Sequence, residues 1–129
     1  MSETYICVAT RLRARGPRVL PPFLKASFQV SRTARRAPGN VRTRLLGLPP
    51  LLTFFTLTVW ESDEAMRDFV ETPEHRAAMA HMDEWASAGE FVQFSATTAR
   101  VGWRAARRHL RSNPSVLPQG PADSRPRRI

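Results

Sequence analysis

The stretch LTFFTLTVWESDEAMRDFVETPEHRAAMAHMDEWA, residues 52–86, decides how this chain is expected to fold. Its first part, residues 52–60, is rich in β-branched and aromatic side chains and therefore predicts a strand. Successive side chains of a strand point to opposite faces. One face is wholly apolar, with Phe55, Leu57 and Val59. The other mixes threonines with large aromatic rings, in Phe54, Thr56, Thr58 and Trp60. The first face predicts a packed layer, and the second suits a pocket wall or a second sheet.

Two helix starts follow this strand. Ser62 is a favourable N-cap, and acids occupy the first turn after it, where the helix dipole favours negative charge. Thr72 followed by Pro73 marks a second start, because proline is tolerated at the first helical position. From there one helical stripe holds His75, Met79, Met82 and Ala86. Gly89 is expected to end this helix.

The remaining elements complete an alternating order. Strands are predicted over residues 4–12, 41–48 and 90–100, and a helix from residue 21 or 22 to residue 35. A breaker at residues 37–40 precedes the second strand, and a turn at residues 47–50 joins the second and third strands as a hairpin. The order β-α-β-β-α-β predicts an α+β fold of the ferredoxin-like type. Its four-stranded antiparallel sheet would carry both helices on one face.

This arrangement leaves the other face of the sheet without a helix. We expect Phe54 and Trp60 on that open face, where two large aromatic rings would form a costly exposed patch in a monomer. A second copy that packs sheet against sheet would cover them. The sequence therefore predicts a homodimer.

Charge is distributed in blocks along the 129 residues. Residues 4–60 hold ten bases and no acid, residues 61–103 hold nine acids and three bases, and residues 104–129 hold seven bases and one acid. Nineteen of the twenty bases are Arg, which first indicates a GC-rich genome. A basic total raises nucleic acid as a partner, but no aromatic residue follows Trp103 to support single-strand binding. We therefore rank nucleic acid last.

Length and composition indicate one domain. With 42% hydrophobic residues, the chain can bury a modest core over residues 1–103. Residues 104–129 are expected to form a basic tail, with a short helix over residues 105–110 and disorder from residue 113. Cys7 is the single cysteine, which excludes an intramolecular disulfide. Apolar runs are too short for a signal peptide or a membrane span, so we expect a soluble, cytoplasmic protein.

The central stretch resembles a known superfamily. The segment FTLTVWES (residues 55–62), the amphipathic helix after it and the run PEHR (residues 73–76) leading to Met79 are similar to the dimeric α+β-barrel proteins. The likeness is greatest to spheroidene-monooxygenase-like domains and antibiotic-biosynthesis monooxygenases, and it covers roughly residues 4–100. The resemblance implies a pocket inside each protomer, between the open face of the sheet and the helices.

Two chemistries are implied by this resemblance. Cofactor-free members oxidise activated aromatic substrates such as anthrones, and their pocket supplies acid–base and polar groups. Haem-binding members hold iron through a helix histidine, and the spheroidene-type enzymes are regarded as haem-dependent. Haem-degrading members carry a Trp and, ten residues later, the ligand His. Phe69 and Met79 stand at those positions here, so a haem would need another ligand, and His75 is the nearest.

His75 is the first candidate for catalysis or for metal ligation. A neutral imidazole on an apolar helix face can bind iron or act as a base near neutral pH. The more common role of a lone histidine is structural, with its ring bonded to a nearby carbonyl. His81 lies off the apolar stripe and His109 lies in the basic tail, so both rank below His75.

The other candidates follow from the faces of the strands. Trp60 could line the pocket or fill the dimer interface, which is the more common role. Arg42 and Arg44 share one face of the second strand and could hold a substrate oxyanion or a haem propionate. Arginine on an edge strand also blocks aggregation. The expected pocket walls are Phe54, Thr56, Thr58, Phe69, Met79 and Met82.

The leading hypothesis is a small homodimeric, monooxygenase-like enzyme for an apolar polycyclic or isoprenoid molecule. In it His75, Trp60 and Arg44 are catalytic, and haem, held by His75 and Arg42, is an open alternative to cofactor-free chemistry. The rival hypothesis is a non-catalytic binding protein with the same pocket. No phosphate loop or Ser-His-Asp order is present to suggest another enzyme class.

Overall fold

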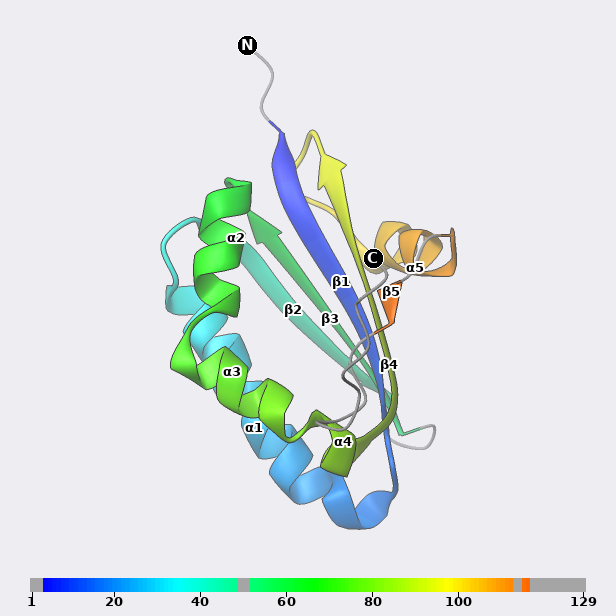
Figure 1. Cartoon of the computed structure of the whole chain (residues 1–129). Helices are drawn as coiled ribbons and strands as arrows, with labels where there is room; N and C mark the ends of the chain where they lie inside the picture. The colour runs from blue at the N-terminus through cyan, green and yellow to red at the C-terminus, as the bar shows by residue number, and fades with distance from the viewer. Residues whose placement is uncertain (1–3, 49–51, 113–114, 117–129) are drawn as a thin grey trace.

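The described strands form one antiparallel sheet in the order β2-β3-β1-β4-β5 (Figure 1). The structure is a computed structural model and describes residues 4–48, 52–112 and 115–116. Its strands are β1 (Tyr5–Ala14), β2 (Asn40–Leu48), β3 (Thr53–Trp60), β4 (Ala86–Ala96) and β5 (Ser115–Val116). The order of the first four strands confirms the predicted ferredoxin-like α+β fold.

Helices lie on both faces of this sheet. Figure 1 shows α1 (Leu20–Arg36), α2 (Asp63–Val70) and α3 (Pro73–Ala80) on one side and α5 (Trp103–Ser112) on the other. A short 3-10 helix, η1 (Pro17–Val19), precedes α1, and α4 (Met82–Trp85) connects α3 to β4. The face under α1–α3 is called the helix face below, and the face under α5 is called the rear face.

The predicted caps set the starts of α2 and α3. The Ser62 hydroxyl accepts a hydrogen bond from the Ala65 backbone N–H at 3.1 Å. The Thr72 hydroxyl accepts one from the His75 backbone N–H at 3.3 Å. Both bonds satisfy an N–H group that a helix start leaves without an intrahelical partner. The second cap fixes His75 in the first turn of α3.

The turn before β2 depends on Gly39. Its φ of +85° lies in the left-handed region that favours glycine. A Cβ at this position would overlap the Cβ of Ala65 in α2. The Gly39 carbonyl accepts a hydrogen bond from the Glu61 N–H at 2.8 Å. The predicted breaker therefore also seats the start of α2 against the sheet.

Gly89 does not end a helix, contrary to the sequence prediction. Helical structure stops at Trp85, and β4 begins at Ala86 and holds Gly89 opposite Leu12 of β1. Ala86 and Ala88 favour a helix locally, but pairing with the long strand β1 overrides that preference and decides the conformation. The fourth strand consequently spans Ala86–Ala96 instead of residues 90–100.

The assignment of the two faces is also corrected. Phe54 and Trp60 lie on the helix face, where they are 6% and 0% exposed, and not on an open face. Trp60 packs against Ala34 and Met66, and Phe54 packs against Phe23 at 5.1 Å between ring centroids. The rear face carries Cys7, Ala9, Leu57 and Val59 and is covered in part by Ala106 and Leu110 of α5.

The sequence predicted a homodimer because Phe54 and Trp60 were expected to be exposed. One protomer already buries both residues, so this reason no longer applies. Homodimerisation stays a prediction.

The stretch expected to be disordered contains β5, which pairs Ser115 with Phe91 and Val116 with Glu90. The other residues from 113 onward, and residues 49–51 of the predicted turn, lie outside the described part of the chain. In the described part, every helix is too short or too polar to span a membrane.

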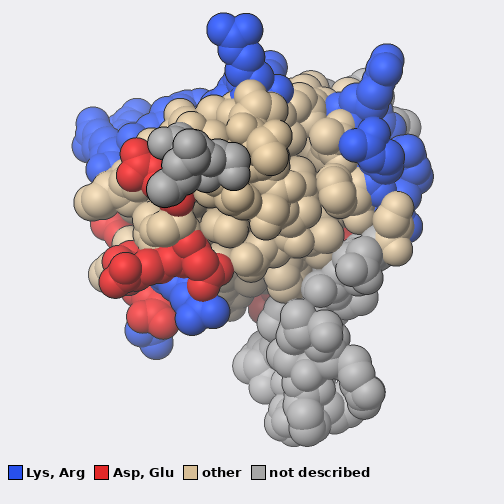
Figure 2. Space-filling model, turned by 90° about the horizontal axis from the view of Figure 1, so that it is seen from above, with Lys and Arg blue, Asp and Glu red and all other residues tan. Residues whose placement is uncertain are grey.

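The charge blocks of the sequence become separate surfaces. Seen from above, acidic side chains gather on one side of the molecule beside some basic ones, and further basic side chains stand apart from them (Figure 2). The acids Asp63, Glu64 and Asp68 stand on α2, on the helix side of the sheet. The exposed bases of α5, on the rear side, are Arg104, Arg107, Arg108 and Arg111. The acids of α2 and the bases of α5 therefore lie on opposite sides of the sheet.

Candidate functional site

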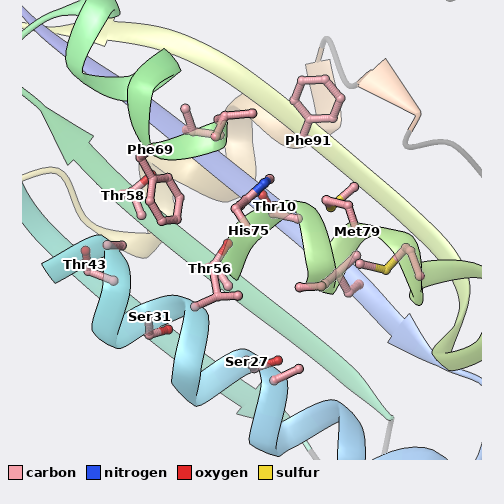
Figure 3. A pocket seen from close by; sticks show the side chains of 18 of the residues that line it. Thr10, Ser27, Ser31, Thr43, Thr56, Thr58, Phe69, His75, Met79 and Phe91 are labelled. Atoms are coloured by element: carbon pink, nitrogen blue, oxygen red, sulfur yellow. The ribbon is translucent and has the colours of Figure 1, made fainter. Parts of the chain in front are cut away.

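A cavity of about 610 Å³ lies between the helix face of the sheet and α1–α3. Large apolar side chains form most of its wall, among them Phe23, Val30, Met66, Phe69, Met79, Met82 and Phe91. A volume of this size accommodates a drug-sized molecule. Figure 3 shows that side chains from the sheet, from α1 and from α3 surround it.

The sheet contributes a patch of hydroxyl groups. Thr10 of β1 is paired with Thr56 of β3, and Thr58 of β3 is paired with Thr43 of β2. Paired residues of neighbouring strands share a face, so all four threonines line the cavity. Thr43 accepts a hydrogen bond from the Asn40 side chain at 2.9 Å. Within the described residues, the hydroxyls of Thr10, Thr56 and Thr58 have no hydrogen-bond partner, so they can bond to a ligand.

Helix α1 contributes the opposite wall. Ser27 and Ser31 are one helical turn apart and both line the cavity. Ser31 is 5% exposed. The apolar lining residues Ala26, Val30 and Ala34 flank the two serines on the same helix. The cavity therefore has hydroxyl groups on two facing walls (Figure 3).

His75 enters the cavity from the first turn of α3. Burial lowers its pKa from the ordinary value of 6.5, and a hydrogen bond with the Val70 backbone partly opposes this shift. The ring meets Phe69 edge-on, with the ring centroids 5.1 Å apart. At neutral pH the imidazole is therefore neutral. Its second nitrogen has no partner among the described residues and can accept a proton.

Trp60 forms the end of the cavity next to Phe69. The two rings stack with centroids 5.2 Å apart and an angle of 28° between their planes. The indole Nε1 is buried, and no described residue accepts its hydrogen bond. A buried N–H group without a partner costs about 1–3 kcal/mol. The ring packing described above offsets that cost.

The structure brings together most of the residues proposed from the sequence. His75, Trp60, Thr56, Thr58, Phe69, Met79 and Met82 all line the cavity. Phe54 does not, because it is buried against Phe23 beside the lining. Their chemical roles stay predictions.

Arg42 and Arg44 lie on the rear face, and this corrects the proposal that they reach the pocket. Arg42 pairs with Val59 and Arg44 with Leu57, so both share the rear face of those residues. Arg42 donates a hydrogen bond to the Ala99 carbonyl at 3.5 Å, and the Arg44 guanidinium lies 5.8 Å from the Trp103 ring centroid. The sheet separates both side chains from the cavity.

Sequence reasoning missed several lining residues, among them Thr10, Thr43, Ser27, Ser31, Arg76 and Gln93. Thr10 could have been predicted as a lining residue, because the alternation of side chains applied to residues 52–60 also holds for β1. It puts Thr10 on the face of the sheet that does not carry Cys7 and Ala9. The spacing of Ser27 and Ser31 likewise indicates one helix face. Neither feature shows which face is covered, and that information comes from packing.

His81, His109 and Cys7 lie outside the cavity lining. His81 is exposed, with a ring nitrogen 2.6 Å from Glu84, and His109 stacks on Phe94 on the rear side. Burial raises the pKa of Cys7 to about 11, so its thiol stays protonated and unreactive. Among the described residues, no three His, Cys, Asp or Glu side chains gather to hold a metal ion.

Comparisons with known proteins agree with this fold. The family model described as antibiotic biosynthesis monooxygenase matches residues 6–81. No curated protein sequence matches the chain. SnoaB from Streptomyces nogalater, a cofactor-independent oxygenase, is similar with a TM-score of 0.59 and 21% identity, over 77% of this chain and 96% of that one.

Two further solved structures are similar at lower identity. Rv0793 from Mycobacterium tuberculosis gives a TM-score of 0.63 with 12% identity, over 76% of this chain and 98% of that one. SO0527 from Shewanella oneidensis gives 0.64 with 12% identity, over 74% and 93%. At these identities the structural likeness concerns the fold alone.

Proposed function

Because this chain belongs to the antibiotic biosynthesis monooxygenase family, we propose that it is a cofactor-independent monooxygenase for an apolar polycyclic molecule. One observation carries the proposal, namely a neutral imidazole in an apolar cavity. SnoaB, which has a similar fold, is a cofactor-independent oxygenase, and this supports the proposal. The substrate would carry an activated methylene group between aromatic rings, conjugated with a carbonyl group.

His75 would start the reaction as a general base. Its free ring nitrogen takes a proton from the methylene carbon, and the electron pair delocalises onto the conjugated carbonyl oxygen. The hydroxyls of Thr56 and Thr58, which line the cavity, would donate hydrogen bonds to that oxyanion. General bases in such positions contribute about 10²- to 10⁴-fold to the rate.

Oxygen then reacts with the substrate anion itself. The carbanion carbon transfers electrons to O₂ and forms a C–O bond, which gives a peroxide, and His75 returns its proton to the distal oxygen. Loss of the second C–H proton and cleavage of the O–O bond then leave a carbonyl group and water. The sum is CH₂ + O₂ → C=O + H₂O, which balances without an external reductant.

Oxygen uptake with anthrone tests this proposal directly. We expect the purified protein, with a chelator present, to consume one O₂ per anthrone and to form anthraquinone faster than buffer alone. Labelled ¹⁸O₂ should place one ¹⁸O atom in the new carbonyl group. Saturable binding of anthrone without oxygen uptake above the buffer rate would instead support the rival, a non-catalytic binding protein.

Haem fits this cavity poorly. His75 could supply one axial nitrogen, and its hydrogen bond to Val70 is the kind of contact that orients a ligand imidazole. However, Arg42 and Arg44 lie on the rear face of the sheet. Among the described lining residues Arg76 is the one Arg or Lys, whereas a haem carries two carboxylates that need a cation. Unpaired hydroxyls would also face the apolar macrocycle, at a cost of about 1–3 kcal/mol each. The proposed reaction therefore proceeds without haem.

A haemin titration provides the corresponding prediction. We expect the absorption spectrum of haemin to change equally with the wild-type protein and with His75→Ala, as non-specific association does. A saturable Soret band that appears with the wild-type protein and is lost in His75→Ala would contradict this and place iron at His75.

A further inference from the structure

Ser27 and Ser31 hold the strongest unexplained feature of the cavity. Both hydroxyls lie on the inner side of α1, one turn apart, and face the sheet across the cavity (Figure 3). Serine is a weaker helix former than alanine, and alanine occupies the neighbouring lining positions 26 and 34. The two serines are therefore not explained by helix formation or by apolar packing.

Their hydroxyls are also free of the bond that serine usually makes inside a helix. A helical serine commonly bonds back to the carbonyl four residues earlier, as Ser112 does with Arg108 at 3.0 Å. In the described structure, neither Ser27 nor Ser31 makes this bond or any other side-chain hydrogen bond. Ser31 is nevertheless 5% exposed. The Ser31 hydroxyl lines the cavity, so a molecule in the cavity is a partner that it can reach.

The facing wall presents the same chemistry. Thr10, Thr56 and Thr58 line the sheet side with hydroxyls that also lack partners among the described residues. A ligand without oxygen atoms, such as an isoprenoid hydrocarbon, would leave all of these groups desolvated and unpaired. A ring system with hydroxyl substituents at two opposite edges, in addition to any ring carbonyl, would pair with both walls.

We propose that Ser27 and Ser31 form a specificity subsite that recognises hydroxyl substituents on the substrate edge next to α1. The threonines of the sheet bind the oxygen at the opposite edge. This inference rests on the proposed function in one respect, since it takes the cavity to be the substrate site. The subsite discriminates between ligands and takes no part in proton transfer, which belongs to His75.

Binding of two unreactive quinones tests the subsite without turnover. The probes are 2,6-dihydroxyanthraquinone, with hydroxyls at two opposite edges, and anthraquinone, which lacks them. Trp60 and Trp85 line the cavity, so quenching of tryptophan fluorescence reports binding. We expect the wild-type protein to bind the dihydroxy probe more tightly. The double variant Ser27→Ala/Ser31→Ala should bind it about tenfold more weakly, as the loss of two neutral hydrogen bonds predicts, and should keep its affinity for anthraquinone.

Ser95→Ala is the matched control, because Ser95 is exposed and lies outside the lining. It should leave both affinities unchanged, and alanine at positions 27 and 31 favours the helix, so the double variant should fold. An equal loss for both probes, unchanged binding of the dihydroxy probe, or no saturable binding to the wild-type protein would overturn the subsite. Discrimination between the probes without oxygen uptake from anthrone would overturn only the proposed function, and oxygen uptake without discrimination would overturn only the subsite.

Discussion

Replacing Trp60 with alanine is expected to lower the free energy of unfolding by about 3–5 kcal/mol, the range for truncating a large buried aromatic residue. Trp60 is 0% exposed and stacks on Phe69 with ring centroids 5.2 Å apart. It also packs against Ala34 of α1 and Met66 of α2. Truncation would therefore loosen both helices from the sheet at one end of the cavity.

Urea unfolding followed by far-UV circular dichroism would measure this loss, and Trp60→Phe separates its causes. Phenylalanine keeps a ring for stacking and removes the buried Nε1–H that lacks a partner. We expect Trp60→Phe to cost less than half as much as Trp60→Ala, because relief of the unpaired N–H offsets part of the lost packing. A loss below about 1 kcal/mol for Trp60→Ala would contradict the packing described here.

The local signals of the sequence predicted the strands and caps well. Ser62 and Thr72 are caps because a small side-chain oxygen next to a helix start has one strong local use. The failure at Gly89 has the opposite cause. Ala86 and Ala88 before it favour a helix locally, and pairing with Ala14 and Arg13 of the distant strand β1 overrides that preference.

The candidate site was predictable in composition but not in orientation. Alternation correctly grouped Thr56 and Thr58 with Trp60, but it could not show which face the helices cover. The apolar side chains of Leu57 and Val59 suggested that the main helical layer packs on their face. In the structure α5 covers that face, and α1–α3 cover the other one. The threonines tolerate the helix side because the cavity keeps them from close apolar contact. Arg42 and Arg44 were misplaced for the same reason, since their face follows from the register of β2 on β3.

His75→Asn is expected to lower kcat for anthrone oxidation by about 10²- to 10⁴-fold, which is the usual contribution of a general base. Asparagine keeps a polar side chain of similar size at the start of α3 but cannot take the substrate proton. The quinone affinities should change little, because the hydroxyls of α1 and of the sheet are untouched. His81→Gln is the control, since His81 is exposed and outside the cavity lining.

The pH profile distinguishes a base from a packing residue. Burial lowers the pKa of His75 below 6.5, so the proton-accepting form persists as the pH falls through 6.5. We expect kcat/KM, measured as initial oxygen uptake between about pH 5 and pH 9, to be level above 6.5 and to fall only as the pH drops through the lowered pKa. His75→Asn should remove this inflection along with the rate. An inflection that survives in His75→Asn, or a rate loss below about tenfold, would assign the proton transfer to another group.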